Sequence, residues 1–375
     1  MIGLGENALR LEISAFIDEN RDWEQKLTDS PYFVRTKRGG GFILLKYDQN
    51  KSDFSLPLVR ECRGLILDET DDYRPVCVPF FKFGNFGERY IPKIDWASAR
   101  AQEKMDGSLI KLWYYKGTWN VSSNSEIDAR NAHLHSALFT RAARTDLYSL
   151  FMESWSKTGL SMDSLDKAFT YMFELTSPHN RVVVRYGETS IWHIGTRDNR
   201  TLLECDPDIG VAKPRSFQFN TLDACIESAT QLGDNDEGYV VVDRNFNRIK
   251  VKSPRYVALN HMSQGVTTRS NVVAIIQKNE QAEFLTYFPE FQAVFDDILY
   301  RIDAFSEQQS ATLTEIKSSS YGSRKDLAAA VVKTECPACI FTLIDGKATT
   351  PRDWLLSLPT ASVLRAIGAD HKQQA

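Results

Sequence analysis

The chain has 375 residues, of which 42% are hydrophobic and 25% are charged. This length and composition indicate an ordinary globular protein of about two domains and exclude a disordered chain. Its formal net charge of −4 at pH 7 is unlike that of a dedicated nucleic-acid-binding domain, so any contact with nucleic acid must come from a local basic patch.

The chain ends and cysteines indicate a cellular location. Acidic residues are spread through the first 23 positions, which favours an amphipathic helix over a signal peptide. No run of about 18 apolar residues is present, so we expect no membrane span. Six scattered cysteines fit a reducing compartment. We therefore expect a cytoplasmic protein.

The first two thirds of the chain mix helical and strand patterns. Residues 1–30 have a helical pattern, whereas residues 32–252 contain many short runs rich in Val, Ile, Tyr, Phe and Trp, bounded by Gly, Asn or Asp. Such runs are typical of strands and turns. Apolar residues at helical spacing interrupt them at about 129–155 and around 221–232. We therefore predict an α+β fold for this part.

The last third has a helical pattern. Residues 272–305 and 324–335 place apolar side chains three and four positions apart, which predicts amphipathic helices. Pro351 stands at a favoured helix start, and Thr360 or Ser362 could cap a final helix that ends at a glycine. We predict a small all-helical domain after about residue 264.

A lysine precedes an Asp-Gly pair in the segment EKMDGSLI. Asp106-Gly107 favours a hairpin turn, because glycine tolerates φ > 0. Lys104 would then lie at a strand end, where backbone can approach a ligand closely. By itself, this pattern is more often an exposed lysine beside a turn.

The segment DNDEGYVVVDRNFNRIKVKS predicts a second hairpin, with its turn at 244–247. Lys250 and Lys252 share one face of the second strand, because residues two apart point the same way. With this turn, Val241 lies opposite Lys250 and Glu237 lies near the same face as both lysines. A register shift would reverse that arrangement, and a solvated amphipathic strand has the same pattern.

These residues together suit phosphoryl or nucleotidyl transfer, which depends on positioning and charge stabilisation. Lys250 and Lys252 can neutralise phosphate oxygens, and the Glu237 carboxylate can hold Mg²⁺. Lys104 can attack as a free amine if nearby cations lower its pKa. The sequence therefore predicts a nucleotidyl-transfer site.

Seven segments in sequence order resemble those of the covalent nucleotidyltransferases, and are most similar to the RNA ligase 1 family of T-even phages: ECRGLIL, FFKFGNFGE, EKMDGS, YMFELTSPHNRVV, IWHIGTRD, DEGYVVV and KVKSPRY. The resemblance implies a mixed antiparallel-sheet nucleotidyltransferase domain, similar to ATP-grasp ligases, at 1–264. It implies a helical domain at 265–375 that selects RNA or tRNA.

The resemblance also implies an activity, an ATP-dependent RNA ligase that uses Mg²⁺ or Mn²⁺. Lys104 takes AMP from ATP, AMP passes to an RNA 5′-phosphate, and an RNA 3′-hydroxyl displaces it. The implied partner is single-stranded RNA or nicked tRNA during RNA repair, and we expect a monomer.

The resemblance assigns roles to further residues. Glu174 matches a ribose-contacting acid, Glu237 a carboxylate for metal-assisted steps, and Tyr256 an aromatic after the last motif. Gly238 matches a motif glycine. The implied ATP-binding residues are Arg63, Lys82, Glu103, Gly107, Glu174, Glu237, Lys250 and Lys252. Arg181 and Arg185 could bind RNA, although ordinary surface charge explains them equally well.

Two departures from the family and two alternatives remain. Asn124 stands in a segment where the family has a lysine, and Gly84 replaces a family aromatic. A DNA ligase or a capping enzyme is one alternative, but these usually continue into a β-barrel where this chain turns helical. A nucleotide- or RNA-binding protein without catalysis is another, and retention of Lys104 with Glu237 argues against it.

Overall fold

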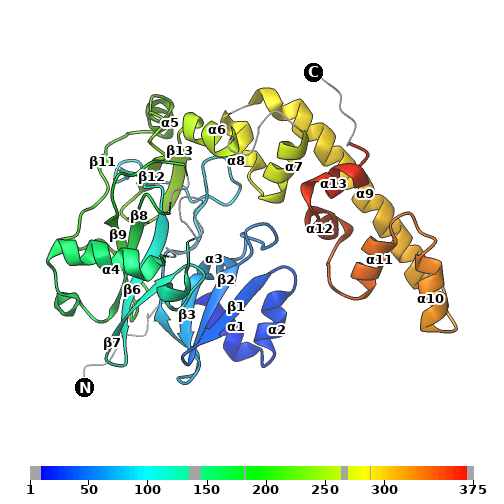
Figure 1. Ribbon diagram of the computed structural model, residues 1–375, viewed down its shortest axis with the longest axis horizontal. Coiled ribbons are helices and arrows are strands. Elements are labelled where there is room, and N and C mark those ends of the chain that lie inside the picture. The colour runs from blue at the N-terminus through cyan, green and yellow to red at the C-terminus, as the bar shows by residue number, and fades with distance from the viewer. Residues whose placement is uncertain (1–9, 135–144, 181–182, 263–268, 288, 370–375) are drawn as a thin grey trace. The chain divides into compact units, whose positions relative to one another are not determined.

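The computed structural model describes the backbone of residues 10–134, 145–180, 183–262, 269–287 and 289–369. The chain divides into two compact units, one extending to Asn260 and the other from His261 onward, with Gln49–Lys51 grouped with the second (Figure 1). Within the described part of the chain, no helix is long and apolar enough to cross a membrane. The domain boundary at 264 stays a prediction.

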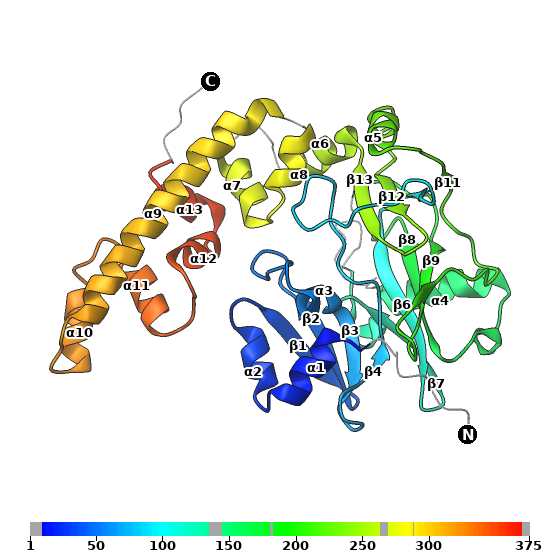
Figure 2. The same cartoon turned by 180° about the vertical axis from the view of Figure 1, so that it is seen from behind.

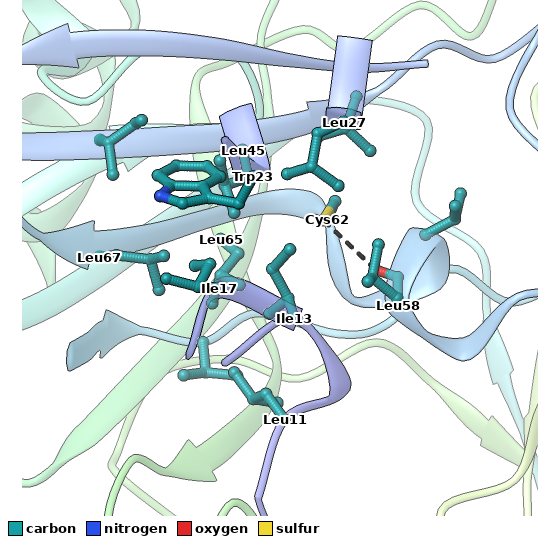
Figure 3. Close-up of a cluster of buried hydrophobic side chains, with 14 of the residues drawn as sticks. Leu11, Ile13, Ile17, Trp23, Leu27, Leu45, Leu58, Cys62, Leu65 and Leu67 are labelled. Atoms are coloured by element: carbon teal, nitrogen blue, oxygen red, sulfur yellow. Dashed lines mark hydrogen bonds between the residues drawn. The ribbon is translucent and has the colours of Figure 1, made fainter. Parts of the chain in front are cut away.

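The first unit begins with a four-stranded antiparallel sheet in the order β1-β2-β3-β4. Figure 3 shows Ile13 and Ile17 from one helix, and Trp23 and Leu27 from the next, packed with Leu45 of the sheet. Alternate residues of β2 face a different cluster, so both faces of the sheet are covered. The elements are α1 Glu12–Glu19, α2 Trp23–Thr28, β1 Val34–Gly39, β2 Phe42–Tyr47, α3 Pro57–Glu61, β3 Arg63–Asp68 and β4 Arg74–Cys77.

A five-stranded antiparallel sheet follows, in the order β10-β9-β8-β6-β7. Helix α4 covers one face, where Phe151 and Trp155 meet the ring of Phe173. The elements are β6 Ser108–Tyr115, β7 Thr118–Ser123, η1 Ala129–Asn131, α4 Leu147–Thr158, η2 Met162–Ser164, β8 Phe169–Thr176, β9 Ser190–Asp198 and β10 Glu204–Cys205.

The third sheet has the order β11-β5-β12-β13 and is also antiparallel. Helix α5 lies beside it (Figure 2) and buries Cys225 and Ala229 against Tyr239, Val241 and Val251. The opposite face of this sheet is therefore left for polar side chains. The elements are β5 Arg100–Glu103, β11 Ser216–Phe217, α5 Leu222–Thr230, β12 Gly238–Val242, β13 Arg248–Lys252 and α6 Pro254–Met262.

The regular elements that the structure describes in the second unit are helices, and an all-helical domain stays a prediction. Pro351 stands in the first turn of α12, as the sequence indicates, and Thr350 and Asp353 make a capping box around it. The predicted cap of the final helix is wrong, because Pro359 holds the N-cap position and the Thr360 hydroxyl donates to Gln277 Oε1 (3.1 Å). The elements are α7 Arg269–Gln277, α8 Gln281–Tyr287, η3 Pro289–Phe291, α9 Gln292–Ser318, α10 Arg324–Val331, α11 Pro337–Ile344, α12 Pro351–Leu356 and α13 Thr360–Ala366.

The α+β prediction is confirmed, since helices are combined with antiparallel sheets. The predicted helix at 129–155 is wrong as a continuous element. Asp128 accepts a bond from Arg130 N and starts a short 3₁₀ turn, and Asp146 caps a new helix by accepting from Ser149 N. His133 and Asp146, which lie between the 3₁₀ turn and the new helix, pair in an isolated β-bridge. These side-chain caps divide the segment.

Candidate active site

Lys104 follows the end of β5 and faces Glu237. Its backbone N–H donates to Gly238 O (2.8 Å), which ties the end of β5 to the start of β12. Its Nζ lies 2.6 Å from Glu237 Oε2, and the two side chains are 19% and 4% exposed. Lys104 is therefore not the exposed lysine that the motif alone would favour.

The predicted Asp106-Gly107 hairpin is wrong, because β5 and β6 belong to different sheets. Gly107 is needed for close approach and not for a positive φ. A Cβ there would lie 2.2 Å from Leu175 O on β8. Its N–H donates to Glu174 Oε1 (3.1 Å), so this glycine brings the Lys104 segment against β8.

Asp106 is buried and fixes the loop after Lys104. Its Oδ2 accepts from Val183 N and Val184 N, both at 2.8 Å. Its Oδ1 accepts from the Tyr256 hydroxyl (2.9 Å), and its N–H donates to the Tyr186 hydroxyl (2.9 Å). The motif aspartate thus ties two other chain segments to the loop after Lys104. They are residues 183–186 and the start of α6, where Tyr256 was matched by resemblance alone.

The predicted register of the β12–β13 hairpin is wrong by one residue. Lys250 pairs with Val240 instead of Val241, because Asp243 leaves the ladder and joins the turn. The Asp243 carboxylate accepts from the backbone N–H groups of Asn245 and Asn247, at 2.9 and 3.0 Å. A carboxylate that satisfies turn N–H groups lengthens the connection beyond the simple turn expected from the pattern.

The predicted shared face of Lys250 and Lys252 is nevertheless confirmed. The residues between and beside them, Ile249 and Val251, are buried in the cluster against α5, so the lysines point to the other side. Gly238 has a φ of +138°, which ends the regular alternation of β12. Glu237, just before it, lies on the side of Lys104.

Cations converge beside this face. Burial lowers the pKa of Lys250 well below its ordinary value, and Lys82, Arg63 and Lys104 lower it further. The Arg63 guanidinium and Lys250 Nζ lie 5.3 and 5.0 Å from the centre of the Phe83 ring. The buried Arg63 Nη1 has no hydrogen-bond partner among the described residues. Such an arrangement favours an anionic ligand.

Two carboxylates lie on the other side of Lys104. Burial raises the pKa of Glu174 to about 7, with Lys104 opposing the rise and Glu237 adding to it. Burial also raises the pKa of Glu237, against the effects of Lys104 and Lys252. Within the described ranges no three His, Cys, Asp or Glu residues cluster to hold a metal. A divalent ion here would fit the Mg²⁺ pattern of one or two carboxylates completed by water and phosphate.

A cavity of about 220 Å³ collects these groups. Its wall includes six of the predicted residues: Arg63, Glu103, Lys104, Gly107, Glu174 and Lys250. Glu237 contacts Lys104, which is part of this wall. Lys252 Nζ lies 5.9 Å from the centre of the Tyr256 ring. Lys82 lies to one side, 3.5 Å from Glu88 Oε2.

The remaining predictions fare differently. Glu103 makes a bidentate ion pair with Arg215, at 2.9 and 3.1 Å, in addition to lining the cavity. Arg185 is exposed and does not line the cavity. Arg181 lies outside the described residues.

Sequence reasoning missed part of the wall. Gln102, Val240 and Lys250 form one row across three strands, because Val240 pairs with both of the others. The alternation of β5 could have indicated Gln102 only if its pairing with β12 had been known. The sequence contains no indication that Arg248 lines the cavity. The same holds for the apolar wall residues Phe80, Met105, Leu109, Ile194 and Pro214. Asn124, noted as a departure, lines the cavity with a buried Oδ1 that has no partner among the described residues.

The chain is similar to proteins described as RNA ligases. A family model described as RNA ligase matches residues 61–256. A protein of Autographa californica nuclear polyhedrosis virus described as a bifunctional polynucleotide kinase/RNA ligase is 30% identical over 288 residues, covering 72% of this chain and 41% of that protein. An RNA ligase of Rhodothermus phage RM378 is 26% identical over 297 residues, covering 62% of this chain and 67% of that protein.

The chain thus spans about two fifths of the length of the viral relative. Among solved structures, an archaeal ATP-dependent RNA ligase superimposes with a TM-score of 0.43 and 12% identity, covering 78% of this chain and 82% of that one. The matched segment 61–256 includes every residue that lines the Lys104 cavity.

Proposed function

The chain belongs to the RNA ligase family, and from this premise we propose that it is an ATP-dependent RNA ligase joining RNA 5′-phosphate and 3′-hydroxyl ends. The observation that carries the proposal is the position of Lys104 Nζ, 2.6 Å from the buried Glu237 carboxylate. Lys104, Arg63 and Lys250 line one cavity. This set offers a nucleophile, a proton acceptor and cations for phosphate within one small space.

In the first step, Lys104 Nζ loses a proton and attacks the α-phosphorus of ATP. A P–N bond forms, the bond to the β-phosphate oxygen breaks, and pyrophosphate leaves. Glu237 Oε2 is placed to receive the proton, because it contacts Nζ and burial raises its pKa. Lys250 and Arg63 act as counter-ions that stabilise the negative charge of the phosphates in the cavity.

In the second step, an oxygen of an RNA 5′-phosphate attacks the same phosphorus, the P–N bond breaks and Lys104 regains a proton. The RNA 3′-hydroxyl then attacks the activated 5′-phosphate, and AMP leaves. Glu237, with Glu174 close by, would hold a Mg²⁺ or Mn²⁺ ion, which supplies further neutralisation of phosphate charge when bound.

The same proposal extends to the organisation of the chain. We assign residues 1–264 as the nucleotidyltransferase domain and residues 265–375 as a helical domain that selects single-stranded RNA or nicked tRNA. The helical character of the described residues after β13 supports this over a DNA ligase or capping enzyme. The close contact of the half-buried Lys104 with the buried Glu237 supports catalysis over simple binding, since binding alone does not need this nucleophile.

The test is to incubate the purified protein with ATP labelled in the α-phosphate and Mg²⁺. We expect a covalent, acid-labile label that is absent from Lys104→Ala. The labelled protein should then circularise a 5′-phosphorylated single-stranded RNA. A folded wild-type protein that takes up no label would exclude the ligase activity, and label without RNA joining would exclude RNA as the acceptor.

A further inference from the structure

A second cavity, of about 480 Å³, lies in the first unit beside the cavity of Lys104. Phe83 and Arg248 line both cavities and so form a common wall between them. Besides these two residues, the wall of the second cavity includes Arg60, Lys82, Arg89, Tyr90, Glu204 and Phe246. We call it the side cavity.

Positive charge dominates the wall of the side cavity. Its one carboxylate, Glu204, is already paired with the buried Arg248 and Arg197. The remaining charged wall residues, Arg60, Lys82 and Arg89, are all cations. This local excess contrasts with the net charge of −4 for the whole chain, so it is a feature of this surface and not of the protein in general.

One of these cations is held in place by backbone carbonyls. Arg60 Nη1 donates to the carbonyls of Phe54 and Ser55, at 2.7 and 2.9 Å. The backbone N–H of Lys82 donates to Arg60 O (2.8 Å), which fixes the two residues next to each other. Positioned cations lose little side-chain entropy when they bind a phosphate.

Aromatic rings stand among these cations. Tyr90 is 52% exposed although it is large and partly apolar. Phe246, at the tip of the β12–β13 turn, has a φ of +59°, and Arg248 lies 5.6 Å from its ring centre. Cations interleaved with accessible rings are typical of surfaces that bind single-stranded nucleic acid, where bases stack and phosphates pair.

We propose that the side cavity binds the 5′-phosphorylated end of single-stranded RNA, with Arg60 and Arg89 against phosphates and Tyr90 against a base. The inference rests on the proposed function, in which an RNA 5′-phosphate must reach the AMP carried by Lys104. Because Phe83 and Arg248 line both cavities, a phosphate in the side cavity would lie next to the cavity of Lys104. The cavity therefore identifies where the second substrate lies.

The test measures binding of a fluorescent, 5′-phosphorylated oligoribonucleotide to the full-length protein without ATP, over a series of salt concentrations. We expect Arg89→Ala to weaken binding about tenfold and to lower the salt slope by about one. Tyr90→Ala should weaken binding about tenfold, whereas Tyr90→Phe keeps the ring and the affinity. The matched control is Arg21→Ala, which removes another exposed arginine of the first unit and should bind as wild type does.

The same preparations are labelled with α-phosphate-labelled ATP, which separates the two proposals. We expect Arg89→Ala and Tyr90→Ala to label as wild type does, which also shows that they fold. Loss of labelling in these variants would mean that the side cavity serves ATP, and would overturn the inference. Equal RNA affinity in Arg89→Ala and Arg21→Ala would overturn it as well. If Arg89→Ala and Tyr90→Ala weaken RNA binding but the wild-type protein takes up no label, the result would support the RNA-binding surface and exclude the ligase activity.

Discussion

At the scale of single residues, Lys104 shares its surroundings with a carboxylate and two cations. The Glu237 carboxylate lies 2.6 Å from Lys104 Nζ, and Arg63 and Lys250 line the same cavity as Lys104. In the proposed reaction the carboxylate receives the proton of the attacking amine. The two cations stabilise the charge of the transferring phosphate.

The first prediction concerns Lys250, whose side chain lines the cavity of Lys104. Lys250→Ala should reduce the rate of labelling by α-phosphate-labelled ATP by about 100-fold, because a positioned cation is lost from the transferring phosphate. Lys93→Ala, which removes an exposed lysine of the same unit, is the control and should label normally. Normal labelling of Lys250→Ala would show that this strand does not serve the nucleotide.

The second prediction concerns His193, a fully buried histidine of β9. Burial lowers the pKa of its imidazole to about 4, with nearby Lys213 adding to the effect. The unfolded chain takes up a proton there below about pH 6.5, and the folded protein does not until about pH 4. This contribution to stability is therefore complete above pH 6.5 and is lost as the pH falls towards 4.

His193→Gln should remove that pH dependence, which corresponds to about 3 kcal/mol between the two limits. The measurement is urea unfolding of wild type and variant at several pH values in this window. His133→Gln, at an exposed position, should retain the wild-type slope. If wild type and His193→Gln lose stability in parallel on acidification, His193 is not the group responsible.

At the scale of elements, the sequence predicted which side chains share a strand face better than it predicted the turns and breaks between elements. The alternation in RIKVKS correctly places Lys250 and Lys252 on one face, because the apolar residues between them must be buried. The turn was wrong because the Asp243 carboxylate binds backbone N–H groups of later residues. The break within 129–155 likewise depends on caps by Asp128 and Asp146. Such side-chain bonds do not alter the apolar pattern, so the pattern cannot reveal them.

The third prediction concerns Gly238, where β12 begins. A Cβ there would lie 2.2 Å from Val251 O, and the residue has a φ of +138°. Gly238→Ala should lower the free energy of unfolding by about 3 kcal/mol and displace Glu237 from Lys104, so that labelling also falls. Gly187→Ala, with no atom within 4 Å of its Cβ, should change neither quantity. Unaltered stability in Gly238→Ala would contradict the observed approach of β12 and β13.

At the scale of the whole molecule, the site is assembled from residues that are far apart in the sequence. Arg63 begins β3, Lys104 follows β5, Glu174 lies on β8 and Lys250 on β13, so all three sheets of the first unit contribute. Motifs could identify these four positions, whose roles stay predictions. The apolar and amide parts of the wall, such as Phe80 and Gln102, could not be identified because they depend on how the sheets meet.

The fourth prediction concerns the division of work between the two units. A chain ending at residue 264 should still label with α-phosphate-labelled ATP, because every residue of the Lys104 cavity precedes that position. Its relative rates on single-stranded RNA and on nicked tRNA should move closer together if the helical part selects the substrate. Unchanged preference would place substrate selection in the first unit.

The central claim is that Lys104 carries AMP, and the most direct measurement is to locate the adduct. The wild-type protein is incubated with ATP and Mg²⁺, digested at neutral pH, and its peptides are analysed by mass spectrometry. We predict an AMP adduct on the side chain of Lys104. An adduct on another lysine, such as the buried Lys111 or the half-buried Lys250, or no adduct in the folded protein, would contradict the account.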